Sequence, residues 1–466
     1  MKKRRPEESV PVRYVVWALC LLVPVVYYFL HLNYRFNNID DAWSFAWAYQ
    51  WWVHGIMEDI VFLGGTEVDL SNFAMLYRVL YGLIGSTFGW TKSSAHLTST
   101  GLVVGASILW AVALKNLGFK TGFCLVFGLL FLLVEPIFGA ANQARVDALA
   151  IFWIAAAVWM ASRRSGPGVG FFTVLAFESH PAGAVHAGGF GLAILGYYIF
   201  KRFQGRERLT ALIKASLGVI VGTVAGGLLY FALYHNTLGH LAHTFARARR
   251  MEGFRLQNYF YSYFFLSHYR LHIPELLLLL FIGVYGYRTG FFRRARLETV
   301  LLGIAVLASV IISRANFNYA AFAYPVILLL FLSFGAYFKK LGLMAIGLAI
   351  FFTLQYSWIY WLQGNYDFPE QTRRLRMAVD DDGLPIFGTA NDWFAFYDRE
   401  FRHYSVPRRG LPDIGRGFYL VRNSADPHPL GRFVRRLLRH YTLIRIDRFE
   451  INGGEITVDK AVVVES

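Results

Sequence analysis

Residues 21–52 read LLVPVVYYFLHLNYRFNNIDDAWSFAWAYQWW, and the fold prediction depends on three features of this stretch. It starts inside an apolar run, Val10–Leu32, which follows the basic sequence MKKRR. The acidic pair Asp40-Asp41 comes next, and a run rich in Trp and Tyr follows it. The apolar run is long enough to cross the ~30 Å hydrocarbon core of a bilayer. We interpret it as a retained first helix with a cytoplasmic N-terminus, because its end lacks the small-residue pattern of a cleaved signal peptide.

Apolar blocks of similar length recur along the 466 residues, which are 56% hydrophobic with a mean hydropathy of +0.41. A spanning segment must satisfy its own backbone polar groups, so the blocks predict helices. The alternating short strands of a membrane barrel do not occur in the sequence. The fold class is therefore an α-helical polytopic membrane protein with about eleven transmembrane helices. After the first helix, the predicted ranges are Ala95–Leu114, Phe119–Phe138, Val146–Ser162, Gly168–Phe200 (two helices divided near His180-Pro181), Leu209–Tyr234, Ile273–Tyr287, Leu297–Ser313, Tyr319–Phe338 and Leu341–Leu362.

The net charge of +16 has a membrane explanation, because Lys and Arg gather in the cytoplasmic connections of multi-span proteins. We therefore do not expect a nucleic-acid partner. An odd number of helices places the C-terminal tail outside. We expect the protein to lie in the cell's inner (plasma) membrane. If the two helices around His180-Pro181 were a single helix, the predicted membrane orientation of every later segment would be inverted. The predicted inner connections carry Lys115 and Lys120; Arg163 and Arg164; Lys201, Arg202, Arg206 and Arg208; Arg288, Arg293, Arg294 and Arg296; and Lys339 and Lys340.

The chain divides into a membrane module, residues 1–362, and a tail, residues 363–466. Two long outer loops, 33–94 and 235–272, interrupt the membrane module. The tail regains Asp, Arg, Gly and Pro, and its size suits a small extracytoplasmic α/β domain. Its strand-like runs are Leu384–Gly388, Gly417–Arg422, Thr442–Ile446 and Ile456–Val464, and its helical patterns are Asp392–Phe401 and Leu430–His440.

The acidic pair has two readings. Asp40 could simply cap a helix, since Asp is a favoured N-cap residue and the aromatic run after it suits a helix lying in the membrane interface. Alternatively, one carboxylate could act as a general base that takes a proton from an attacking hydroxyl. Two ionised neighbours repel, so either one pKa rises or a cation lies nearby.

Several short motifs, taken in order, resemble the GT-C superfamily of membrane glycosyltransferases, which includes protein O-mannosyltransferases, lipid A aminoarabinose transferases and arabinofuranosyltransferases. The first is the acidic pair just beyond the first helix. Its companions are the amphipathic stretch Leu76–Trp90, Arg145-x-Asp147 at the outer start of a helix, Glu178-Ser179-His180-Pro181, and Asn318-Tyr319 through Tyr324-Pro325. The resemblance covers roughly residues 10–362. The pair is Asp-Asp, as in arabinofuranosyl-type members, where mannosyl- and aminoarabinosyl-transferases more often have Asp-Glu.

The resemblance implies an inverting enzyme that moves a sugar from a polyprenyl-phosphate to a glycan, lipid or protein acceptor at the outer face. Asp40 would be the general base, with Asp41 as its support or alternate. Arg145, Asp147, Glu178, His180 and Tyr319 would line or support the cavity. For Arg145 and Asp147 a local ion pair is the plainer explanation, and for His180 a satisfied core residue is.

Five outer arginines are the candidates for binding the donor phosphate. The Arg side chain presents a planar fork that matches phosphate oxygens. Contact with anionic lipids or with the tail's own acids is the alternative. The five are Arg247, Arg249, Arg250, Arg255 and Arg314.

No cofactor is indicated with certainty. The two cysteines, Cys20 and Cys124, lie in apolar blocks and suggest neither a disulfide framework nor a metal site. No Walker-type loop, zinc motif or Ser-His-Asp spacing occurs. A divalent cation could bind at the acidic pair. Rival functions are a polysaccharide polymerase or ligase with a diphosphate-linked donor, a transporter of lipid-linked sugars, and a non-catalytic scaffold.

Overall fold

The structure is a computed structural model. It describes residues 11–27, 39–57, 61, 74–235, 273–312, 317–363, 367–404, 413–424, 435, 438–451 and 454–463. Within these ranges, only the backbone is described for residues 39–40, 273, 309–312, 317–320, 356 and 358–363.

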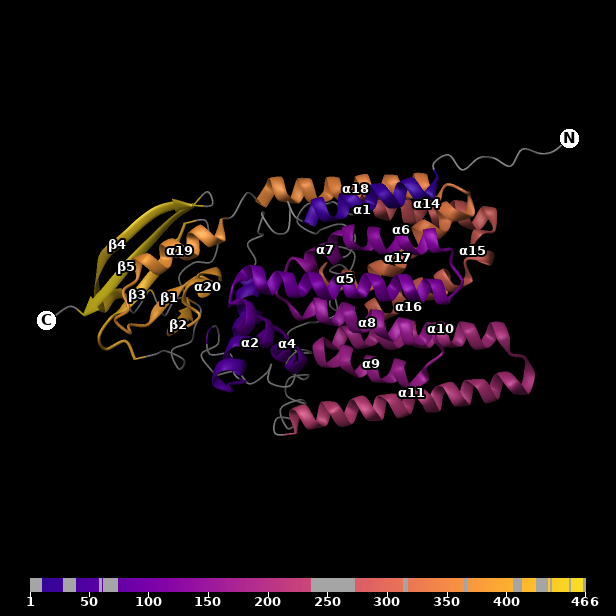
Figure 1. Ribbon diagram of the computed structural model, residues 1–466, viewed down its shortest axis with the longest axis horizontal. Helices are drawn as coiled ribbons and strands as arrows, with labels where there is room; N and C mark the ends of the chain where they lie inside the picture. The colour runs from indigo at the N-terminus through magenta and orange to yellow at the C-terminus, as the bar shows by residue number, and fades with distance from the viewer. Residues whose placement is uncertain are drawn as a thin grey trace.

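A bundle of long helices fills one part of the molecule, and a small sheet domain lies beyond one end of it (Figure 1). The helices α2 and α4 lie at the end of the bundle that faces the sheet domain (Figure 1). The helices of the bundle are α1 (Val12–Val26), α2 (Ile39–His54), α4 (Met75–Phe88), α5 (Lys92–Asn116), α6 (Thr121–Leu133), α7 (Glu135–Ala141), α8 (Val146–Ser162), α9 (Gly166–Ser179), α10 (Pro181–Arg202), α11 (Gly205–Tyr234), α14 (Ile273–Thr289), α15 (Phe291–Arg294), α16 (Arg296–Ile312), α17 (Phe317–Tyr337) and α18 (Leu341–Gln363).

Apart from α2, α4 and α15, which lie in none of the predicted membrane ranges, these helices overlap the ranges that hydropathy predicts, with one exception. The predicted single helix Phe119–Phe138 is two helices, α6 and α7, bent by 65° at Val134. Pro136 explains the break, because in a continuous helix its ring would clash with the carbonyl of Leu132 and its missing N–H would remove a hydrogen bond, whereas it is tolerated in the first turn of a new helix. The break near His180-Pro181 is confirmed: α9 ends at Ser179 and α10 begins at Pro181.

The predicted count of about eleven spans is not confirmed. Among the described residues, α5, α10 and α11 are long and apolar enough to cross a membrane, and the bent pair α6–α7 could be a fourth span. The apolar helices α1 and α8 have 15 and 17 residues. At 1.5 Å per residue they are somewhat shorter than the ~30 Å hydrocarbon core.

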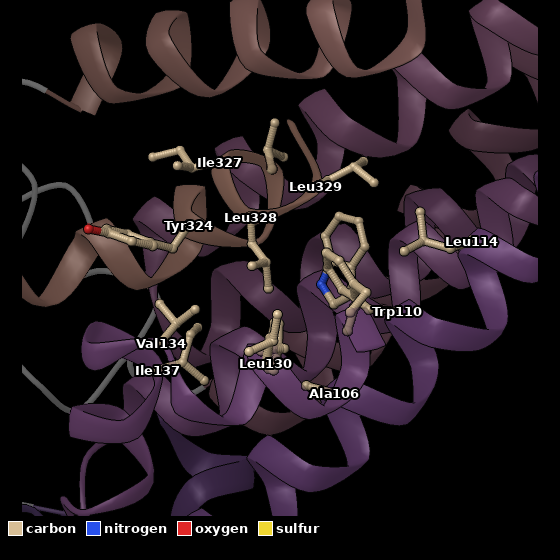
Figure 2. Close-up of a cluster of buried hydrophobic side chains, with 14 of the residues drawn as sticks. Ala106, Trp110, Leu114, Leu130, Val134, Ile137, Tyr324, Ile327, Leu328 and Leu329 are labelled. Atoms are coloured by element: carbon tan, nitrogen blue, oxygen red, sulfur yellow. The ribbon is translucent and has the colours of Figure 1, made fainter. Parts of the chain in front are cut away.

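The bundle is held together by a continuous apolar core between α5, α6, α7 and α17. Figure 2 shows Trp110 of α5 among side chains from α6 and α17. The Trp110 side chain is almost fully buried, as are Leu130 and Leu328. An aromatic side chain of this size contributes about 3–5 kcal/mol against truncation in a packed core.

The basic connections gather at the end of the bundle opposite the sheet domain. The guanidinium of Arg164, after α8, lies 3.8 Å from the ring centroid of Tyr198. Arg202, at the end of α10, donates a hydrogen bond of 2.8 Å to the same tyrosine. Two connections far apart in sequence therefore share one face, as the positive-inside rule predicts for a cytoplasmic surface.

The C-terminal part contains a mixed sheet whose five strands, within the described residues, follow the order β2-β1-β3-β5-β4. Strand β1 pairs in parallel with β2 and β3, whereas β5 pairs antiparallel with β3 and β4. This agrees with the predicted small α/β domain. Its elements are α19 (Phe368–Ala378), β1 (Ile386–Gly388), η4 (Ala390–Asp392), α20 (Trp393–Phe396), β2 (Phe401–His403), β3 (Phe418–Asn423), η6 (Leu438–His440), β4 (Tyr441–Ile451) and β5 (Gly454–Val463).

One local prediction in this domain is only partly confirmed, and one helix was not predicted. The helical pattern predicted over Asp392–Phe401 contains the short helix α20 and then turns into strand β2, which begins at Phe401. Helix α19 was not predicted, although Asp367 caps it by accepting a hydrogen bond from the amide of Glu370. Most of the second predicted helix, Leu430–His440, lies outside the described residues.

Glycines allow α9 and α11 to pack at backbone contact. A Cβ on Gly222 of α11 would overlap the carbonyl oxygen of Pro167, and one on Gly170 of α9 would overlap that of Val219. Small residues at such positions are the usual means by which membrane helices approach closely. Gly227, on the same helix, has no heavy atom within 4 Å of its would-be Cβ.

We predict that Gly222→Ala destabilises the protein by about 1–3 kcal/mol, because the added methyl group must separate the two helices. Gly227→Ala is the matched control and should be neutral or stabilising by about 0.5–1 kcal/mol, since alanine favours a helix over glycine. Thermal unfolding of the purified protein in detergent measures both. Equal effects of the two substitutions would contradict the packing described here.

Candidate active site

The candidate site lies at the end of the bundle that meets the sheet domain, and α2 carries the acidic pair into it. Asp40 and Asp41 fall in the first turn of α2, which begins at Ile39. One face of this helix, with Ala42 and Phe45, is completely buried. The alternation of this face with exposed residues such as Trp52 follows from the helical period.

The buried face of α2 packs against protein rather than lying only in a membrane interface, as the aromatic run suggested. The ring centroid of Phe45 lies 5.1 Å from that of Trp90 and 6.1 Å from that of Trp393. Tyr49 lies 5.5 Å from Tyr397 in an edge-on contact. Since Trp393 and Tyr397 belong to the C-terminal domain, that domain covers the helix. A single-segment pattern cannot reveal a cover supplied by residues some 350 positions away.

The Asp41 carboxylate is fully buried and is bound on both oxygens. Its Oδ2 lies 3.2 Å from Lys92 Nζ and 3.0 Å from His96 Nε2. Its Oδ1 accepts a hydrogen bond of 2.8 Å from the backbone amide of Ala144. The expectation that a cation lies beside the pair is fulfilled by Lys92.

Burial raises the pKa of the Asp41 carboxyl, but its neighbours more than offset this. The charges of His96 and Lys92, and the hydrogen bonds from His96 and Ala144, lower the pKa below its ordinary value of 3.8. Asp41 is therefore an ionised carboxylate at neutral pH. A buried charge is tolerated only when it is paired and hydrogen-bonded.

Lys92 connects this carboxylate to the C-terminal domain. The lysine side chain is itself buried, with 3% exposed. Its Nζ lies 3.8 Å from the ring centroid of Phe368 in α19 and 3.4 Å from Oδ1 of Asn391 in η4. The ammonium thus sits between a carboxylate of the membrane module and an aromatic ring and an amide of the C-terminal domain.

Two tyrosines of α4 lie near Asp41. Tyr77 and Tyr81 are stacked with ring centroids 4.0 Å apart. Tyr77 donates a 2.6 Å hydrogen bond to the carbonyl of Ala144, and the Tyr81 hydroxyl lies 2.6 Å from Ser99 Oγ. These bonds fix α4 against α5 and against the connection that precedes α8.

Arg145 and Asp147 form the local ion pair that their spacing suggests. Arg145 Nε lies 2.9 Å from Asp147 Oδ2, and the Asp147 side chain is almost fully buried in the first turn of α8. Burial raises the pKa of the Tyr81 phenol, and the carboxylates of Asp41 and Asp147 raise it further. Both carboxylates therefore act on the same tyrosine, which places Asp147 in the same neighbourhood as Asp41.

Glu178 joins three helices through its hydrogen bonds. Its Oε1 accepts hydrogen bonds from the amide of Leu76 at 3.0 Å and from the hydroxyl of Tyr234 at 2.6 Å. Tyr234 in turn accepts a hydrogen bond from the amide of Met75. These contacts join the start of α4 to the ends of α9 and α11. Tyr234 has no counterpart in the sequence-based prediction.

His180 caps α10. Its Nδ1 accepts a hydrogen bond of 3.2 Å from the amide of Ala182, and its ring lies 5.6 Å from that of Phe322. The break at Pro181 therefore forms the turn between α9 and α10, and His180 stabilises this turn.

Seven predicted site residues are either not described by the structure or described only in their backbone. The side chains of Asp40 and Tyr319 are not described, although both residues fall in helices. Their roles, and those of the arginines, stay predictions. The arginines outside the described residues are Arg247, Arg249, Arg250, Arg255 and Arg314.

Lys92 and His96 are the functional candidates that the sequence-based analysis missed. Their spacing of four places both on one helix face, and Lys92 is a basic residue in the loop that is predicted to lie outside. That departure from the charge rule was the available signal. Within the described residues, no group of three or more His, Cys, Asp or Glu side chains could hold a metal ion.

Two solved structures share this architecture. One is ArnT from Cupriavidus metallidurans in the apo state, with a TM-score of 0.59, 13% identity, and coverage of 96% of this chain and 97% of that chain. The chain has the fold of ArnT. ArnT from Cupriavidus metallidurans bound to undecaprenyl phosphate gives a TM-score of 0.59 at 11% identity, covering 96% of this chain and 98% of that chain.

ArnT is a lipid A aminoarabinose transferase of the GT-C group, so the predicted resemblance is confirmed at the level of the fold. No protein-family model and no curated protein sequence matches the chain. The identity of 11–13% explains this, because the helical framework persists where the sequence signal has been lost.

We predict that Asp41→Asn costs about 3–5 kcal/mol of stability, because it leaves the Lys92 ammonium buried without its counter-ion. Adding Lys92→Met should recover part of the loss, since no unpaired buried charge remains and methionine still packs on Phe368. Thermal or denaturant unfolding of both variants tests this. Strictly additive losses would contradict the pairing.

A pH dependence follows from the same pair. The pKa of Asp41 is lower in the folded than in the unfolded protein, so its stabilisation is present above the ordinary value of 3.8. It is lost as the pH falls below that value through the folded pKa. The stability gap between wild type and Asp41→Asn should therefore narrow as the pH falls below about 4. A gap that stays the same or widens below that pH would contradict this assignment.

Proposed function

We propose that the protein is a GT-C-type glycosyltransferase of the inner (plasma) membrane, which transfers a sugar from a polyprenyl-phosphate donor to an acceptor at the outer face. The observation that carries the proposal is the ArnT fold over 96% of the chain, with the acidic pair at the head of a helix buried beneath the C-terminal domain. The N-terminus is cytoplasmic and the C-terminal domain extracytoplasmic in this proposal.

Asp40 is our candidate for the general base, and Asp41 is its support. Asp41 is already bound on both oxygens by Lys92, His96 and Ala144, which suits a carboxylate that fixes the helix end rather than one that accepts a proton. The lowered pKa of Asp41 also makes it a weak base. Asp40, its neighbour on the same helical turn, would then take the proton.

The reaction is an inverting displacement. An acceptor hydroxyl or amine attacks the anomeric carbon of the donor sugar and loses its proton to Asp40. The bond from that carbon to the phosphate oxygen breaks, and the electron pair leaves with the polyprenyl phosphate. Arginines such as Arg247 and Arg250 would bind this phosphate through bidentate hydrogen bonds. The acceptor is a glycan, a lipid or a protein.

The test is a transfer assay with the purified protein and a panel of polyprenyl-monophosphate sugars, with one diphosphate-linked glycan included. Transfer should occur from a monophosphate donor. Asp40→Asn should reduce the rate by about 10²–10⁴-fold, the usual contribution of a general base, without changing the melting temperature. Asp381→Asn is the matched control, because its side chain is 93% exposed, and it should retain full activity.

Two results would overturn the proposal. Full activity of Asp40→Asn would remove the base. Use of the diphosphate donor alone would favour a polysaccharide polymerase or ligase.

A further inference from the structure

A cavity lies at the opposite end of the bundle from Asp41. It has a volume of about 550 Å³, within the usual range of ~300–1,000 Å³ for ligand pockets. Its wall includes Lys120 before α6, Arg294 in α15 and Lys339 after α17. Helix α5 has 25 residues and separates this end from Lys92 by roughly 37 Å at 1.5 Å per residue.

The charge of the cavity is positive. Its charged lining residues are Lys120, Arg294, Lys339 and Glu298. Glu298 is buried and accepts a 2.8 Å hydrogen bond from Ser333, so its carboxylate is held in the wall. Among the residues that the structure describes, the three cations form no ion pair with a carboxylate, and Arg294 lies 5.5 Å from the Tyr337 ring centroid.

The backbone at Lys339 gives a separate indication that its side chain matters. Lys339 has φ of 57°, in the left-handed region where glycine is usual. It follows α17 in a Schellman-type turn, in which the Lys339 amide donates to the carbonyl of Ala336 and the Lys340 amide to that of Gly335. A lysine at this position costs roughly 1–2 kcal/mol relative to an ordinary helical conformation. Such strain is a reason to look for a role of the side chain.

An apolar groove of about 450 Å³ lies farther along two of the helices that carry the cavity. It runs between α1 and α18 and is lined by Val15, Leu19, Leu22, Ile346 and Ile350, among others. Val12 and Leu341, in the wall of the basic cavity, lie one turn or so before Val15 and Ile346 on the same helices. A basic cavity beside an apolar groove on the same two helices matches a headgroup joined to an acyl chain.

We propose that this cavity and groove bind an anionic phospholipid of the cytoplasmic leaflet. The phosphate contacts Lys120, Arg294 and Lys339, and an acyl chain lies in the groove between α1 and α18. Basic pockets between helices on the cytoplasmic side are known to take anionic headgroups, at about 1 kcal/mol for each Lys or Arg. The groove selects a lipid over free phosphate, because inorganic phosphate has no apolar part to bury. The choice of the cytoplasmic leaflet rests on the proposed orientation of the protein, whereas binding at the site does not depend on the transfer reaction.

The experiment measures lipid binding to the delipidated, purified full chain by native mass spectrometry and by the shift in melting temperature. The probes are phosphatidylglycerol, phosphatidylcholine and inorganic phosphate. Phosphatidylglycerol should bind and stabilise the wild type most strongly. Inorganic phosphate should have little effect.

Lys339→Gly is the sharpest variant, since it relieves the left-handed backbone and so should fold at least as well as the wild type. It should weaken phosphatidylglycerol binding roughly fivefold, the equivalent of about 1 kcal/mol. Lys120→Gln and Arg294→Gln together with it should weaken binding by about a hundredfold if the three charges act independently.

Arg164→Gly is the matched control. Arg164 has φ of 66° and ends α8 in the same type of turn, on the same face, but does not line the cavity. It should leave lipid binding unchanged. Equal losses in Lys339→Gly and Arg164→Gly would show only general surface attraction and overturn the site. Binding of phosphatidylcholine or inorganic phosphate as strong as that of phosphatidylglycerol would also overturn it.

Discussion

The buried charge of Asp41 is the constraint on which the candidate site depends. An ionised carboxylate with no solvent contact requires counter-charges and hydrogen-bond donors, and here they come from Lys92, His96 and Ala144. Those three residues belong to α5 and to the connection before α8. The acidic end of α2 can therefore occupy its place only when these elements are assembled around it. The ion pair between Asp41 and Lys92 therefore favours one packing arrangement at this end of the bundle, and it contributes less to the overall stability of the protein.

The same ion pair explains why the C-terminal domain belongs to the site. Lys92 is shielded from water by Phe368 and held by Asn391, and α2 is covered by Trp393. Without this cover the ammonium and the carboxylate would be solvated and their attraction screened. The chain thus has two chemically different ends: a sealed, charge-paired end beneath the sheet domain, and an exposed basic end that carries the cavity around Lys339.

The sequence predicts what local patterns determine. Helix α8 was placed at Val146–Ser162 without error because Arg145 and Arg163 bracket an uninterrupted apolar block. The break at His180-Pro181 was found because proline acts locally. The burial of Lys92 was not predicted, since its partner Asn391 lies 299 residues away and no period or spacing encodes that contact. The bend after α6 was missed although Glu135 and Pro136 mark it, because the apolar residues on both sides of them resemble one continuous span.

The proposed reaction requires that a polyprenyl phosphate binds at the Asp41 end of the bundle. An experimental structure of the full chain with undecaprenyl phosphate bound tests this requirement. Density for the phosphate is expected at the end that carries Asp41 and Lys92, beneath the C-terminal domain. A phosphate found only at the opposite end, in the cavity beside Lys339, or no ordered lipid at saturating concentration, would contradict the proposed reaction.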